Sequence, residues 1–133
     1  MMIARMTPII TTDKLAEEKE FYSKFFGFKV IFEYANQHIG MQSSGNDDVV
    51  ISFMAPNEQT PPYQGQGVTV CLEVTDVDAQ SERLTAAGLP IVVPIQDNPW
   101  GDRSFISVDP AGVSVYVYSP TEPTEEFKKC FKE

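Results

Sequence analysis

The sequence predicts an α+β fold in which a module of order β-α-β-β-β occurs twice within one domain. The chain has 133 residues, of which 42% are hydrophobic, so it can bury one core but is too short for two independent domains. Residues 57–67 are rich in Pro, Gly and Gln, which is the composition of a linker. Strand-like and helix-like segments follow the same order before and after this linker. We therefore interpret residues 1–133 as a single domain made of two related modules.

The first module covers about residues 1–56 and contains one helix. Apolar residues recur at helical spacing over 14–28, and Gly27 provides a stop at the end of that pattern. Runs of β-branched and aromatic residues, separated by turn-forming residues, predict strands. These strands are expected at 6–12, 29–35, 37–43 and 48–55.

The second module covers about residues 68–120 and repeats this order. A helix is expected over 76–88, with Gly88 as its stop. Strands are expected at 68–75, 90–96, 103–109 and 113–119. A last helix is expected over about 124–132, because Phe127 and Phe131 are four residues apart.

Charge and cysteine content limit the classes of partner. The chain has 19 acidic and 10 basic residues, a net charge of −9, so nucleic acid is excluded as a partner and a cationic ligand is favoured.

Cys71 and Cys130 form no CxxC motif and are expected to be thiols in a reducing cytoplasm. We recognise no targeting segment and no apolar stretch long enough to span a membrane.

Side-chain alternation separates the two faces of each strand. In 113–119 one face is aliphatic and the other carries Tyr116 and Tyr118, and the strands at 48–55 and 68–75 divide similarly. The aliphatic faces should be covered by the helices. The mixed faces, too polar for a sealed core, indicate either a ligand-sized concavity or an ordinary solvent-facing sheet. They carry Ser52, Thr69, Cys71, Glu73, Tyr116 and Tyr118.

The stretch NPWGDRSF, residues 98–105, places the single Trp of the chain in an expected turn. A Trp side chain buries well but has an N–H that needs a hydrogen-bond partner. Trp100 is therefore either a structural residue that fills the turn or an aromatic surface that contacts a ligand. Asn98, Pro99 and Gly101 are turn-forming residues. Asp102 and Arg103 are interpreted either as ligand contacts or as an ion pair with each other on the surface.

Several of these segments resemble the vicinal oxygen chelate superfamily, which includes glyoxalase I, extradiol dioxygenases, and fosfomycin- and bleomycin-resistance proteins. The resemblance is carried by DKLAEEKEFYSKFFGF, by LEVTDVDAQSERLTAAGLPI and by NPWGDRSFISVDPAGVSVYVYS, in which DPAG is the most specific element. It covers nearly the whole chain. It implies paired β-α-β-β-β modules whose sheets form a concave cleft, and a homodimer.

Enzymes of that superfamily hold a divalent metal with His, Gln or Glu on four inner strands. The resemblance places these four positions at Thr7, Ser52, Thr69 and Tyr116. Neutral hydroxyl groups do not supply the anionic or imidazole donors of such a site. A shift of one residue would move each position onto the aliphatic face. We therefore expect no metal and no other cofactor.

The remaining polar residues do not form a recognisable catalytic set. His38 could act as a base or donate a hydrogen bond to a ligand, but a polar residue on a partly exposed strand is the simpler interpretation. Cys71 lacks an activating partner in the sequence and is interpreted as a small packing residue. No catalytic residue is assigned.

The resemblance is closest to the metal-free bleomycin-resistance type, which binds a drug without chemistry. It implies a metal-independent binding protein for a small molecule, aromatic or cationic, with sequestration of a bleomycin-like antibiotic as the most specific form. Two alternatives remain: an enzyme of lyase, isomerase or dioxygenase type with a displaced or absent metal, and a dimeric accessory protein with a vestigial cleft. The expected stacking residues are Phe32, Trp100, Tyr116 and Tyr118, and the expected polar contacts are His38, Ser52, Thr69, Glu73, Asp102 and Arg103.

Overall fold

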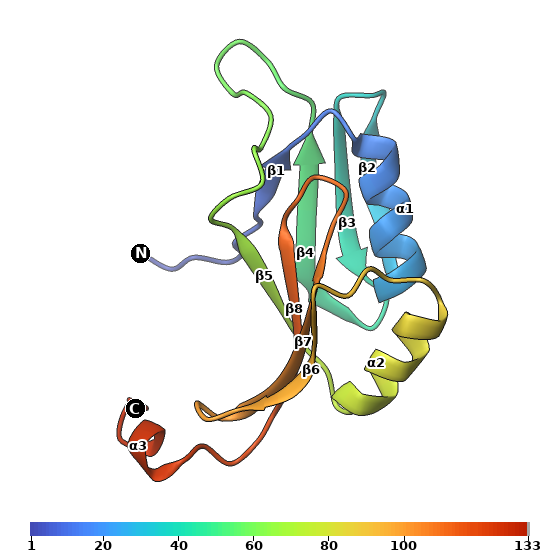
Figure 1. The fold of residues 1–133 in the computed structure, drawn as a ribbon. Helices are drawn as coiled ribbons and strands as arrows, with labels where there is room; N and C mark the ends of the chain where they lie inside the picture. The colour runs from blue at the N-terminus through green and yellow to red at the C-terminus, as the bar shows by residue number, and fades with distance from the viewer. Residues whose placement is uncertain (133) are drawn as a thin grey trace. The chain divides into compact units, whose positions relative to one another are not determined.

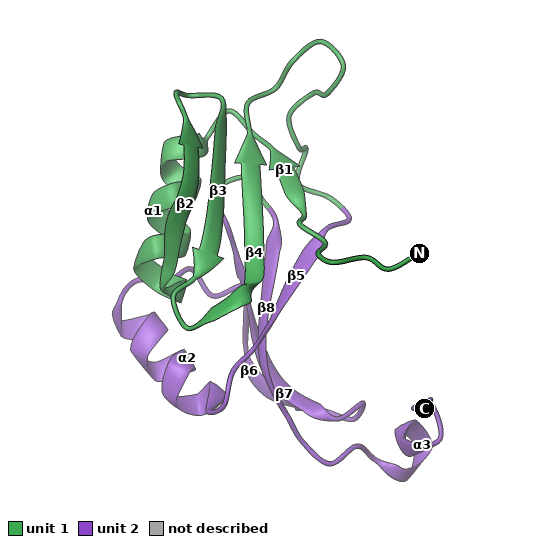
Figure 2. Ribbon diagram, turned by 180° about the vertical axis from the view of Figure 1, so that it is seen from behind, with its two compact units in different colours: residues 1–66, 110–112 green, residues 67–109, 113–133 purple. Residues whose placement is uncertain are grey.

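The computed structural model describes residues 1–132 and divides into two compact units. Unit 1 consists of residues 1–66 and 110–112, and unit 2 of residues 67–109 and 113–133 (Figure 2). Each unit contains a four-stranded sheet and at least one helix. The predicted α+β class, with two modules of order β-α-β-β-β, is confirmed.

Unit 1 contains five elements (Figure 1). They are β1 (Ile9–Thr11), α1 (Leu15–Phe26), β2 (Phe28–Tyr34), β3 (His38–Ser43) and β4 (Asn46–Met54). The strand order is β1-β4-β3-β2, with β1 parallel to β4 and the other pairs antiparallel. A parallel pair needs a crossover, and α1 begins that connection.

Unit 2 repeats this topology. Its elements are β5 (Thr69–Glu73), α2 (Val77–Ala86), β6 (Val93–Asn98), β7 (Asp102–Val108), β8 (Ser114–Pro120) and a final short helix, α3 (Glu125–Lys128). The strand order is β5-β8-β7-β6, with β5 parallel to β8. The two sheets are therefore connected in the same way, as the sequence pattern predicts.

The helices cover the aliphatic face of each sheet, which confirms the predicted separation of faces. In unit 1, α1 lies against its sheet (Figure 1), and the buried Tyr22 ring is centred 5.4 Å from that of Phe53. In unit 2, α2 contacts β7 and β8 on the side of Phe105 and Val117, both fully buried. The opposite face of the unit 2 sheet carries the polar and aromatic residues.

Several element boundaries differ from those expected. The strand expected at 6–12 is reduced to Ile9–Thr11, because Pro8 has no N–H to donate to a ladder. The strand expected at 90–96 begins only at Val93. The chain before it still belongs to the end of α2, because the N–H of the buried Leu89 bonds to the carbonyl of Leu84 in that helix. Such ends depend on hydrogen bonds that residue periodicity does not specify.

The helix expected over 124–132 is also shorter than predicted. It consists of Glu125–Lys128 and buries none of its residues. A single turn of helix with no fully buried residue has little to stabilise it. Among the helices of residues 1–132, none is long and apolar enough to cross a membrane.

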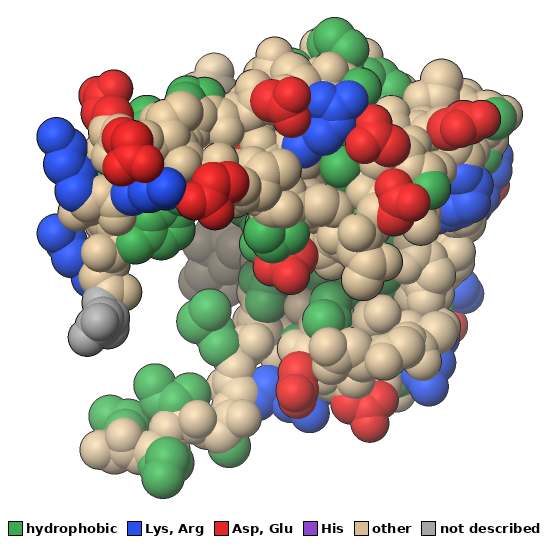
Figure 3. All heavy atoms as spheres, turned by 90° about the horizontal axis from the view of Figure 1, so that it is seen from below, with side chains coloured by type: hydrophobic (Ala, Val, Ile, Leu, Met, Phe, Trp, Pro, Cys, Tyr) green, Lys and Arg blue, Asp and Glu red, His purple; other side chains and the backbone are tan. Residues whose placement is uncertain are grey.

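On the face shown in Figure 3, acidic side chains are spread over the surface rather than gathered in one patch.

The first turn of α2 offers a test of the fold. The Asp76 side chain accepts a hydrogen bond from the Ala79 N–H at 3.1 Å and so caps the helix. We expect Asp76→Ala to lower the free energy of unfolding by about 1 kcal/mol, because the cap is lost. Urea denaturation would measure this change. The exposed Glu82 in the same helix provides the control, since Glu82→Ala should change stability by less than about 0.5 kcal/mol.

Candidate functional site

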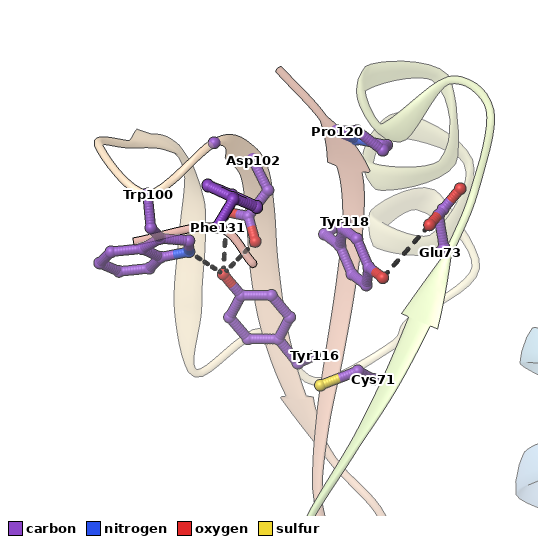
Figure 4. A pocket seen from close by; sticks show the side chains of 9 residues that line it. Cys71, Glu73, Trp100, Asp102, Tyr116, Tyr118, Pro120 and Phe131 are labelled. Carbon is purple, nitrogen blue, oxygen red and sulfur yellow. Dashed lines mark hydrogen bonds between the residues drawn. The ribbon is translucent and has the colours of Figure 1, made fainter. Parts of the chain in front are cut away.

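A cavity of about 530 Å³ lies on the polar face of the unit 2 sheet (Figure 4). The register explains its composition, because Cys71 lies opposite Tyr116 and Glu73 opposite Tyr118 in the parallel pair of β5 and β8. Residues directly opposite each other point to the same face. The cavity is lined by Cys71, Glu73, Trp100, Gly101, Asp102, Tyr116, Tyr118, Pro120 and Phe131.

The turn between β6 and β7 places Trp100 at the edge of this cavity. The Gly101 N–H donates to the Asn98 carbonyl at 3.2 Å, and Gly101 has a φ of 116°, which favours glycine. A Cβ atom at Gly101 would also lie 3.2 Å from the Cβ of Pro123. The turn therefore depends on glycine, and it leaves 44% of Trp100 exposed.

A hydrogen-bond network centred on Tyr116 joins this turn to the sheet. The Tyr116 hydroxyl donates its proton to the Asp102 carboxylate, whose two oxygens both lie 2.9 Å away. The same hydroxyl oxygen accepts from Trp100 Nε1 at 3.3 Å (Figure 4). The Asn98 amide donates to Asp102 Oδ1 at 2.7 Å and to Ser104 Oγ at 2.8 Å. The orientation of the indole is thus fixed through a phenol and a carboxylate.

Asp102 is the buried group of this network. Only 8% of the residue is exposed, and the Tyr116 hydroxyl and the Asn98 amide that donate to it are both neutral. The salt bridges found among residues 1–132 do not include it. A buried carboxylate is stabilised by such donors, but its negative charge is not cancelled by them. A positive group entering the cavity would therefore be favoured.

Both tyrosines of the cavity are neutral near physiological pH. Burial raises the pKa of Tyr116, and the neighbouring Asp102 adds to this effect. Burial also raises the pKa of Tyr118, whose hydroxyl donates to Glu73 Oε1 at 3.3 Å. Their ring centres are 5.8 Å apart with planes tilted by 51°. The two rings and Trp100 form an aromatic wall with carboxylates at Asp102 and Glu73.

Five of the candidate residues from the sequence come together in this cavity. They are Glu73, Trp100, Asp102, Tyr116 and Tyr118. Thr69 lies on the same face of β5, opposite Ser114, but does not line the cavity. Three further candidates belong to unit 1: the rings of Phe32 and His38 meet edge to face at 5.6 Å, and Ser52 lies opposite Gly40. A role for these three in ligand binding stays a prediction.

Arg103 lies on the other face of the sheet, away from the cavity. Its guanidinium pairs with Asp78 of α2 at 3.0 Å and with Asp97 of β6 at 3.2 Å, and these hydrogen bonds raise its pKa. The surface pair with Asp102 that we considered does not form, because consecutive strand residues point to opposite faces. The structure therefore does not place Arg103 with the other candidate contacts.

Some residues of the site are not evident from the sequence. Asn98 was interpreted as a turn residue, yet its side chain supports Asp102, which follows from alternation once the β6–β7 register is known. Cys71 was expected to be a packing residue, but it is exposed and lines the cavity. The spacing of Phe127 and Phe131 predicts a last helix, but no pattern in the sequence places Phe131 or Pro120 at the cavity.

The four positions that the family resemblance assigns to metal ligands do not fit a metal ion here. Thr7 is exposed and precedes β1, and the other three are Ser52, Thr69 and Tyr116. Their side chains are neutral hydroxyls, and the Tyr116 proton is engaged by Asp102. Within residues 1–132 no group of three or more His, Cys, Asp or Glu is arranged to hold a metal ion. The donor set is therefore unsuited to a divalent cation.

Sequence comparison relates the chain to a known family. The profile of the Glyoxalase/Bleomycin resistance protein/Dioxygenase superfamily matches residues 3–117. An uncharacterised protein of Mycobacterium bovis is 30% identical over 117 residues, which cover 80% of this chain and 77% of the relative.

Solved structures show the same fold at lower identity. The lactoylglutathione lyase of Agrobacterium tumefaciens has a TM-score of 0.70 and 23% identity, covering 87% of this chain and 92% of its own. TnmS3, an antibiotic binding protein from Streptomyces sp. CB03234, has a TM-score of 0.70 and 22% identity, covering 90% and 98%. At such identities the likeness establishes the fold alone.

The Tyr116 network can be tested by removing one hydroxyl group. Tyr116→Phe takes a donor from the buried Asp102 and an acceptor from Trp100, so we expect the free energy of unfolding to fall by about 1–3 kcal/mol. Urea denaturation followed by Trp100 fluorescence would measure both the stability and the indole environment. Tyr118→Phe is the matched control, because its hydroxyl bonds to the exposed Glu73, and it should cost less than about 0.5 kcal/mol.

The same residue should give the protein a pH dependence. Because the pKa of Tyr116 is raised on folding, the folded state holds the phenolic proton more tightly than the unfolded chain. Its contribution to stability is complete below the ordinary tyrosine value of 10.0 and is lost as the pH rises through the raised pKa. In denaturation series across this range, the wild type should lose stability more steeply than Tyr116→Phe. Parallel curves would contradict the assignment.

Proposed function

Because this chain belongs to the Glyoxalase/Bleomycin resistance protein/Dioxygenase superfamily, we propose that it is a binding protein for a small molecule and works without a metal ion. The most specific form of this proposal is sequestration of a flat, cationic antibiotic of the bleomycin type.

The observation that carries the proposal is the combination of an aromatic wall with a buried carboxylate. Trp100, Tyr116 and Tyr118 offer ring surface to a flat ligand, and Asp102 and Glu73 offer negative charge beside it. A cation held over an aromatic face gains about 0.5–2 kcal/mol, more as the site is desolvated. Among residues 1–132, the lining contains no Lys or Arg that would repel a positive ligand.

Binding without a metal is supported by the state of Tyr116. A phenol with a raised pKa that donates its proton to Asp102 would lose this hydrogen bond on becoming a metal ligand. Hydrogen bonding, rather than coordination, then organises the site. We assign no catalytic residue, because the carboxylates of Asp102 and Glu73 accept hydrogen bonds from the hydroxyls of Tyr116 and Tyr118.

The solved structures support both the proposal and its main alternative. TnmS3 is described as an antibiotic binding protein, which is the activity proposed here. The lactoylglutathione lyase has the same fold, and an enzymatic role with a displaced or absent metal is therefore the rival function. The carboxylate and ring arrangement favours binding over the enzymatic role.

The proposal also includes a homodimer in the cytoplasm. The homodimer is supported by the family resemblance. The location is supported by Cys71 and Cys130, both free and exposed, since such thiols persist in a reducing compartment. We also propose that Phe32, His38 and Ser52 in unit 1, and Thr69 in unit 2, contact ligand on the faces of their own sheets.

Calorimetric titration with bleomycin A2 and with proflavine, a planar cation, tests the proposal. We expect binding in the micromolar range, accompanied by quenching of Trp100, the single Trp of the chain. Trp100→Ala should weaken binding at least tenfold because the stacking surface is lost, and Trp100→Phe should retain part of the affinity. Val92→Ala, at an exposed apolar residue of unit 2 outside the cavity lining, is the control.

Three results would contradict the proposal. They are wild-type affinity in Trp100→Ala, loss of binding after treatment with a chelator, and conversion of the bound compound into a product detected by mass spectrometry. The last two would favour the enzymatic alternative.

A further inference from the structure

The chain that follows β8 returns to the Trp100 turn. We call residues 121–132 the C-terminal segment. The Thr121 N–H donates to the Gly101 carbonyl at 2.8 Å, and the Thr124 N–H donates to the Pro99 carbonyl at 3.0 Å. Pro123 packs against Gly101 so closely that a Cβ atom at Gly101 would lie 3.2 Å from the Cβ of Pro123. The beginning of the segment is thus held firmly to the turn.

The middle of the segment contacts Trp100 through a residue that is not part of the Tyr116 hydrogen-bond network. The ring of Phe127 lies edge to face with Trp100, with ring centres 6.4 Å apart and planes at 70°. Trp100 Nε1 meanwhile donates to Tyr116. The indole therefore contacts both the sheet, through Tyr116, and the C-terminal segment, through Phe127.

The end of the segment is held differently. Lys128 pairs with Glu122 at 2.7 Å and with Glu125 at 3.0 Å, and the Cys130 N–H bonds to the Phe127 carbonyl at 2.9 Å. These bonds all join residues of the segment to each other. They keep the turn of α3 together without fixing it to the sheet.

Phe131 lies at this end and lines the cavity. Figure 4 shows its side chain beside Asp102, Tyr116 and Trp100. Nevertheless 65% of the residue is exposed to solvent. A large apolar side chain that is left in water next to a cavity gains free energy when a ligand or a wall covers it.

We propose that the C-terminal segment closes over the bound molecule and that Phe131 is the contact that determines how tightly it is held. The inference rests on the proposed binding function and deepens it. The anchored residues 121–124 set the position of the segment, and its locally bonded end moves Phe131 onto the ligand. The favoured ligand is a flat one, because it can present one face to Tyr116 and the other to Phe131.

This arrangement predicts a kinetic effect rather than a loss of the site. The ligand enters while Phe131 is exposed. Removal of the Phe131 ring should therefore leave the association rate within about twofold of the wild-type rate. A contact made after entry slows dissociation. We expect Phe131→Ala to raise the dissociation rate of proflavine about tenfold, which corresponds to about 1.4 kcal/mol.

Stopped-flow displacement of proflavine from the wild type, Phe131→Ala, Phe131→Tyr and Lys132→Ala measures this effect. Phe131→Tyr keeps the ring and should restore slow dissociation, and Lys132→Ala, the neighbouring residue outside the cavity lining, is the matched control. Because Phe131 is exposed, thermal unfolding should be the same for all four proteins.

The outcomes separate this inference from the proposed function. A dissociation rate in Phe131→Ala equal to that of the wild type, with wild-type binding intact, would overturn the role of the segment and leave the binding function standing. Failure of the wild type to bind either proflavine or bleomycin A2 would overturn both. An increase in Phe131→Ala that Lys132→Ala shares would show a general effect of the segment end and would also overturn the assignment to Phe131.

Discussion

The buried carboxylate of Asp102 is the interaction on which the site depends. A carboxylate removed from water requires hydrogen-bond donors, and Asp102 obtains them from Tyr116 at 2.9 Å and Asn98 at 2.7 Å. These residues lie on β8 and at the end of β6, so one carboxylate of β7 connects three strands. The Tyr116 oxygen then accepts from Trp100. The position of the Trp100 side chain thus follows from the hydrogen bonds that the buried Asp102 carboxylate requires.

The separation of charges across the sheet explains why this carboxylate remains available to a ligand. Arg103 follows Asp102 directly in the chain, yet alternation directs it to the helix side, where Asp78 and Asp97 pair with it. Arg103 therefore cannot neutralise Asp102. The network satisfies the hydrogen-bonding capacity of the carboxylate and leaves its charge without a counterion among the described residues.

The sequence predicts those parts of the fold and site that depend on local periodicity. Alternation over β8 separates Val115 and Val117 from Tyr116 and Tyr118, and the structure buries the two valines and leaves the two tyrosines partly exposed. Contacts between distant segments could not be predicted in this way. The partners of Arg103 depend on hairpin register and on the placement of a helix, and neither is encoded in the periodicity of one strand. Phe131 reaches the cavity through a chain return that no repeat pattern indicates.

The same alternation explains how one topology can hold sites of different chemistry. The buried core beside β5 and β8 is formed by the aliphatic residues on one face of this strand pair. Tyr116, Tyr118 and Cys71 lie on the other face and contribute little to that core. Residues on this face can therefore differ while the topology of the sheet is kept. At the position that the family resemblance assigns to a metal ligand, Tyr116 carries a hydrogen-bonded phenol instead of an acidic or imidazole donor. Selection of a ligand in our proposal then depends on ring stacking and charge, which are properties of side chains and not of topology.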